Sequence, residues 1–150
     1  MVDWMVTRRR ILRAAVLGAV ALAFPRWASR GRATTAPKDT LLYFIYPRDG
    51  ARIKGAFWCR FGLRGMGVTH AGDNFPNSGH HHLLVDVAQP LELTEPIPAD
   101  KTHLHFGAGQ TETKIDLPRG RHTLQLVLGD ASHIPFDPPV ISKKITVTIL

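Results

Sequence analysis

The strongest constraint on the fold is a strict alternation of apolar and polar residues over short segments. One segment places Phe57, Cys59 and Phe61 on one face of an extended chain, with Trp58 and Arg60 on the other. A period of two is typical of a strand with one buried face. No window carries an apolar repeat at helical spacing. The sequence therefore predicts an all-β domain.

Further segments of this kind follow one another, separated by glycine- and proline-containing turns such as Pro47–Gly50 and Pro118–Arg121. The predicted strands are residues 41–46, 56–63, 80–87, 103–106, 111–117, 122–128 and 140–150. Long irregular connections are expected at residues 64–79, 88–102 and 131–139. Short strands at this density, roughly six to eight in about 110 residues, favour an immunoglobulin-like β-sandwich.

The first 33 residues have the layout of an export signal. Consecutive arginines at Arg8–Arg10 precede a short apolar stretch, Ala14–Phe24, and small residues at Gly31 and Ala33 suit a cleavage site. As a helix, that stretch would reach only about 16 Å, against a hydrocarbon core of about 30 Å. We expect a cleavable twin-arginine signal at residues 1–33, with no stable membrane span after cleavage. The alternative is that these residues are a basic, uncleaved amphipathic anchor.

The signal also accounts for the basic charge of the whole chain. Residues 1–33 hold seven of the 19 basic residues and one of the 12 acidic residues. The remainder is nearly balanced and shows no basic stripe with interleaved aromatic residues, so nucleic acid is not an expected partner. The predicted organisation is a signal at 1–33, a linker at 34–40 and one β-sandwich domain at 41–150, in a periplasmic or otherwise extracytoplasmic location. Cys59 is the single cysteine, so no internal disulfide is expected.

Histidines are the main candidates for function. All eight lie between His70 and His133, and two tight clusters stand at His80–His82 and at His103 and His105. On a strand, residues two apart share a face, so each cluster can direct two imidazoles at one centre. Imidazole suits copper, zinc, nickel or iron. These positions predict a metal site built from His80, His82, His103 and His105.

Other residues near the clusters have two readings each. His81 falls on the apolar face, as a hydrogen-bonded core histidine or as a further ligand, and Met66 is either packing or a soft ligand for cuprous ion. Asp86 and Asp130 are either surface carboxylates or acceptors that orient a histidine ring. His133 lies in a loop, where a ligand role and a solvent-exposed role are both open.

Taken together, several segments resemble an exported bacterial family catalogued as a domain of unknown function. They include Gly79–Asp86 (GHHHLLVD), His103–Gly107 (HLHFG), Gly109–Glu112 (GQTE) and His122–Asp130 (HTLQLVLGD). The resemblance extends from about Leu41 to Leu150. It implies an extracytoplasmic single-domain protein and supplies no activity or ligand.

The favoured function is binding, delivery or storage of a metal ion, with copper first and zinc as the alternative. Such a role needs ligands but no acid, base or nucleophile, and the sequence contains no recognisable catalytic arrangement. A second hypothesis is a cell-envelope interaction module, supported by the outward-facing Trp58, with an envelope protein as partner. A third is a small enzyme using the same histidine cleft, between the 64–79 loop and Gln110.

Overall fold

A computed structural model describes residues 33–150. The predicted signal, residues 1–33, lies outside these residues except for Ala33. Within the described residues, no helix is long and apolar enough to cross a membrane. The predicted linker, 34–40, packs on the domain, because Thr35 bridges to Asp137 and Ala36 is 5% exposed.

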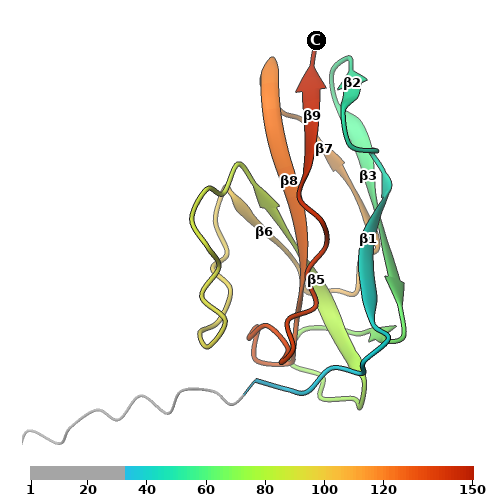
Figure 1. Ribbon diagram of the computed structural model, residues 1–150, viewed down its shortest axis with the longest axis vertical. Coiled ribbons are helices and arrows are strands. Elements are labelled where there is room, and N and C mark those ends of the chain that lie inside the picture. The colour runs from blue at the N-terminus through green and yellow to red at the C-terminus, as the bar shows by residue number, and fades with distance from the viewer. Residues whose placement is uncertain (1–32) are drawn as a thin grey trace, which may run out of the picture.

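The described chain folds into two sheets that pack face to face (Figure 1). The smaller sheet has the order β1-β3-β7, formed by Leu41–Tyr46, Phe57–Arg64 and Glu112–Ile115. The larger sheet has the order β2-β9-β8-β5-β4, formed by Ala51–Ile53, Ile145–Ile149, Gly120–Gly129, Ser78–Val85 and Gly67–Val68. β6, His103–Phe106, also pairs with β5. The predicted all-β sandwich is confirmed.

The core between the sheets follows the alternation in the sequence. Phe57, Cys59 and Phe61 of β3 point inward and are at most 6% exposed, whereas Trp58 on the opposite face is 50% exposed. Leu126 of β8 is fully buried in the same core. Burial raises the pKa of the Cys59 thiol to about 12, so the thiol stays protonated at neutral pH and packs as a small apolar group.

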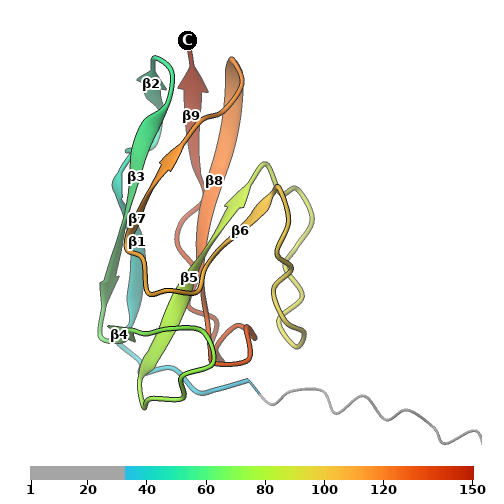
Figure 2. The ribbon, with the colours of Figure 1, turned by 180° about the vertical axis from the view of Figure 1, so that it is seen from behind.

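β5 is buried on both of its faces, because it lies in the middle of the larger sheet and is covered from outside. β8 pairs with one edge of β5, and β4 and β6 share the other. The 86–102 connection covers the outer face, where Leu84, Ile97 and Val127 form a second apolar cluster. Figure 2 shows this connection beside β5 and β6, away from the smaller sheet. Side chains on the outer face of β5 are therefore sheltered from water.

The structure differs from the predicted strands in two respects. β2 and β4 were not expected, because two or three residues are too few to show an alternating pattern. The last strand begins at Ile145, not at Val140, because Ile141 forms only an isolated bridge to Val127.

An ionised pair at the turn after β5 gives a prediction about pH. His122 Nδ1 donates to Asp86 Oδ2 at 2.7 Å and Nε2 donates to the Pro118 carbonyl at 2.8 Å. Both partners only accept, so the ring makes both hydrogen bonds only when it is doubly protonated. Burial lowers the pKa of His122, but the hydrogen bonds to Asp86 and Pro118 outweigh it and raise the pKa above 6.5. The pKa of Asp86 is lowered, because the hydrogen bonds from His122 and Thr123 outweigh burial.

The pair should therefore stabilise the fold most between about pH 4 and 6.5, where both groups are charged even in the unfolded chain. Its contribution is lost above that range as the pH rises through the folded-state pKa of His122. At pH 6, the free energy of unfolding of the wild type should exceed that of His122→Gln by about 1 kcal/mol. The difference is no larger because Asp86 is 45% exposed and water screens the pair. Urea denaturation at pH 6 and pH 9 measures the difference. An equal difference in the free energy of unfolding between the two proteins at pH 6 and pH 9 would contradict this prediction.

Candidate metal centre

Three consecutive histidines of β5 divide between the two faces of the larger sheet. His81 points into the core, where its ring lies 5.2 Å from that of Phe61 and Nδ1 donates to the Gln110 carbonyl at 3.1 Å. His80 and His82 point to the outer face and are fully buried. Of the two readings open for His81, the structure therefore places it as a hydrogen-bonded core histidine.

Strand pairing brings a third imidazole to the outer face. The register between β5 and β6 sets His82 directly opposite His105, and their ring centroids are 5.0 Å apart. The His80 ring is also 5.0 Å from that of His105. His80 Nε2 and His82 Nε2 are 3.1 Å apart. Among the described residues, the Nδ1 atoms of both buried rings have no hydrogen-bond partner.

These three residues form a set of donors that fits a metal ion. One ligating nitrogen from each of His80, His82 and His105 lies within 4.8 Å of the others. His80 and His82 are buried with Nδ1 atoms that have no hydrogen-bond partner, and a metal ion is a partner that takes an imidazole lone pair. The set contains no carboxylate, so it does not suit Ca²⁺ or Mg²⁺, which prefer oxygen. The arrangement can hold a transition-metal ion.

The surroundings keep these imidazoles in the neutral form that binds metals. Burial, followed by the neighbouring histidines, lowers the pKa of His80 to about 4 and that of His82 to about 3. The pKa of the exposed His105 is lowered too, by burial first and by His133 second. At neutral pH the three nitrogens therefore carry free lone pairs without having to lose a proton.

Two glycines leave room for the rings. A Cβ at Gly107 would lie within 3 Å of the His105 imidazole. A Cβ at Gly129 would lie 3.0 Å from His82 Nε2 and 3.4 Å from the Cα of His133. Because neither glycine has a side chain, the His105 imidazole can lie beside Gly107 and the His82 imidazole beside Gly129 of the neighbouring strand β8.

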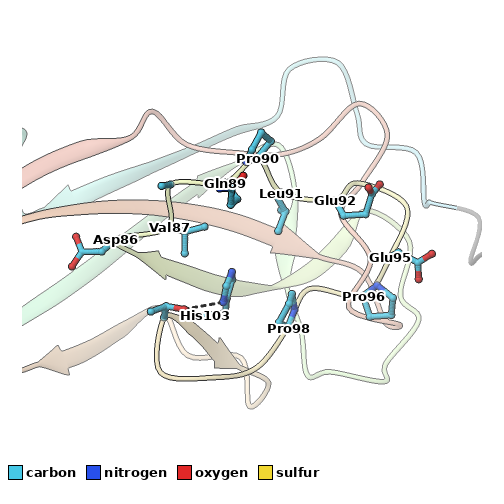
Figure 3. A pocket seen from close by; sticks show the side chains of 12 residues that line it. Asp86, Val87, Gln89, Pro90, Leu91, Glu92, Glu95, Pro96, Pro98 and His103 are labelled. Carbon is cyan, nitrogen blue, oxygen red and sulfur yellow. Dashed lines mark hydrogen bonds between the residues drawn. The ribbon is translucent and has the colours of Figure 1, made fainter.

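Besides His81, the structure places two more of the candidate ligands, His103 and Met66, away from the cluster. His103 lies opposite Leu84 on β5, and its Nδ1 donates to Asp100 Oδ1 at 2.9 Å. It lines a pocket of about 430 Å³ under the 86–102 connection, as Figure 3 shows, and none of the three clustered histidines lines that pocket. Met66 is partly buried and packs against the core between the sheets.

A fourth ring approaches the cluster from the turn after β8. The His133 centroid lies 4.9 Å from that of His80 and 4.8 Å from that of His105. The sequence left this histidine open between two roles, because the contact depends on the path of the chain after β8. Asp130, a predicted acceptor, is buried in the same turn, whereas Asp86 orients His122 instead.

Fold and site together define a small β-sandwich with a sheltered histidine cluster able to hold a metal ion. Residues 59–150 match a family described as a domain of unknown function, DUF4399. The chain belongs to this family. The match includes both histidine clusters and the turn that carries His133.

Other comparisons add little. No curated protein matches the sequence significantly. Among solved structures, the endo-beta-1,4-mannanase from Thermotoga petrophila is similar at 17% identity over 75% of this chain, with a TM-score of 0.44. The chain spans 20% of that structure. So limited a similarity carries no argument about function.

Proposed function

We propose that this protein binds one copper ion through His80, His82 and His105, and that it stores or delivers the ion outside the cytoplasm. The observation that carries the proposal is the convergence of three ligating nitrogens within 4.8 Å, two of them on fully buried side chains. Copper is favoured over zinc because affinity for nitrogen ligands rises along the first-row series to Cu²⁺ and falls at Zn²⁺.

The location rests on the sequence of residues 1–33. Their paired arginines and short apolar stretch favour export by the twin-arginine route. That route carries chains already folded, so the domain can take up its ion before it leaves the cytoplasm. A binding role also agrees with a sequence that contains no recognisable catalytic motif.

Titration of the metal-free full chain, purified without a polyhistidine tag, tests this function. We expect one Cu²⁺ per chain with a submicromolar Kd, and an affinity for Zn²⁺ at least about tenfold weaker. Chelator competition gives both constants. Tighter binding of Zn²⁺ would overturn the choice of copper, and binding of neither ion at submicromolar concentrations would overturn the metal-binding function itself.

An interaction module is the second candidate function. The outer face of the smaller sheet exposes Tyr43, Ile45 and Trp58, which are 42%, 54% and 50% accessible. Exposed aromatic residues are enriched at protein interfaces. A chain that bound no metal, but lost an envelope-protein partner on Trp58→Ala, would favour this candidate.

A further inference from the structure

We propose that His133 is a fourth ligand, which makes the centre a closed four-histidine site whose ion enters past the 130–134 turn. The inference rests on the proposed function, since it concerns the same ion. It goes further by assigning the coordination number and the path of exchange.

The four rings surround a common centre. Their six centroid separations are 4.9 Å for His80–His82, 5.0 Å for His80–His105, 4.9 Å for His80–His133, 5.0 Å for His82–His105, 6.0 Å for His82–His133 and 4.8 Å for His105–His133. Four points that are nearly equidistant from one another lie at the corners of a tetrahedron. The rings are therefore arranged tetrahedrally, with one edge longer than the rest.

This size agrees with a four-coordinate metal. Metal–nitrogen bonds of about 2.0–2.1 Å put imidazole centroids about 3.2 Å from the ion, and thus about 5.2 Å apart in a tetrahedron. Five of the six separations lie within a few tenths of an ångström of that value. The exception is the edge between His82 and His133, at 6.0 Å. His133 is accordingly outside the tightest set of three, and we expect its ring to move slightly toward that of His82 when the ion binds.

Hydrogen bonds fix the backbone of the turn that carries His133. Asp130 Oδ1 accepts hydrogen bonds from the backbone N–H groups of Ser132 and Ile134, at 2.8 and 3.0 Å. Asp130 Oδ2 accepts one from Thr34 Oγ1 at 2.8 Å. His133 itself has φ of +67°, a left-handed conformation that side chains other than glycine adopt uncommonly. Its N–H donates to the Asp130 carbonyl at 2.9 Å.

Exposure indicates the side from which the ion enters. His80 and His82 are fully buried, whereas His105 is exposed and His133 is half-buried. His105 belongs to a paired strand, but His133 lies on a turn, so we expect the His133 side chain to rotate away while the backbone of its turn stays hydrogen-bonded. Its carbonyl accepts from the Ile97 N–H at 2.8 Å, which links this turn to the 86–102 connection. Four protein ligands leave no open position, and a closed site suits holding an ion over catalysis.

The test compares His133→Gly with wild type in the full chain. Glycine adopts positive φ at no steric cost, so the turn is retained while the imidazole is lost. His133→Asn, which also tolerates this conformation, is the second variant. His70→Ala is the matched control, because His70 is a loop histidine with a 69% exposed side chain that faces Asp73. Readouts are the Kd for Cu²⁺, its dissociation rate and the visible absorption of the Co²⁺-loaded protein.

We expect both His133 variants to keep one ion per chain, with faster dissociation and an affinity lowered at least about 10- to 100-fold, which is the cost of removing only a hydrogen-bond partner of a ligand. The Co²⁺ spectrum should change from a strong tetrahedral band to a weaker one, and His70→Ala should match wild type. Unchanged Kd and Co²⁺ spectrum in His133→Gly would overturn the fourth ligand and leave a three-histidine site. A wild type that binds no metal would instead overturn the proposed function.

Discussion

Replacing His105 with alanine should weaken copper binding by about 100-fold or more, whereas replacing His103 should leave the Kd within about twofold. Both histidines lie on β6, two residues apart. Only His105 faces the ring of His82, while His103 is hydrogen-bonded to Asp100. His105 is exposed, so its removal takes away a ligand without opening a cavity in the core. Chelator competition on the two variants measures the difference.

A third variant tests whether the position of the His105 ring matters as well as its presence. Gly107→Ala retains His105 but puts a methyl group where its imidazole lies, so the ring has to shift. We expect an intermediate loss of affinity with little change in stability, because the ring is at the end of an exposed side chain. Equal affinities in His103→Ala and His105→Ala would exclude the histidine cluster as the site.

Metal should stabilise the fold by a large amount. An ion that binds only the native state adds about 2.7 kcal/mol at a free concentration of 100 times its Kd. For a domain of this size, that free energy corresponds to a rise in Tm of roughly 10 °C. Thermal unfolding of the full chain with and without copper, followed by circular dichroism, measures the shift.

The control for this stabilisation is His105→Ala at the same free copper concentration. With an affinity lowered about 100-fold, the variant should gain only about 0.4 kcal/mol, which is a shift of a few degrees at most. A shift of equal size in the variant and the wild type would mean that copper acts elsewhere on the chain.

The faces of the strands could be predicted from the sequence, because alternation alone decides them. His80 and His82 were expected on the face opposite His81, and the structure places them there. Trp58 was expected to face outward and Cys59 inward, and both do. What alternation does not give is which strand lies beside which, and therefore which histidines meet.

The register between β5 and β6 determines which histidines belong to the cluster. His103 and His105 have the same parity on β6, so the sequence treated them alike. Pairing with β5 sets His105 opposite His82 and His103 opposite Leu84, and the local turn at Asp100 then binds the His103 ring. His133 approaches the cluster through the turn after β8, and no pattern within 131–139 indicates this contact. The Gly129–Asp130 pair, which opens that turn, indicates a turn at this point but not the contact with the cluster.

X-ray absorption of the copper-loaded full chain reports the atoms bound to the ion, and so decides whether the histidine cluster holds it. We expect one copper per chain with three or four nitrogen neighbours at about 2.0 Å and the outer-shell scattering of imidazole rings. His105→Ala should lose one of these imidazoles. A first shell of sulfur or mainly oxygen, or the same imidazole count in wild type and His105→Ala, would contradict this expectation.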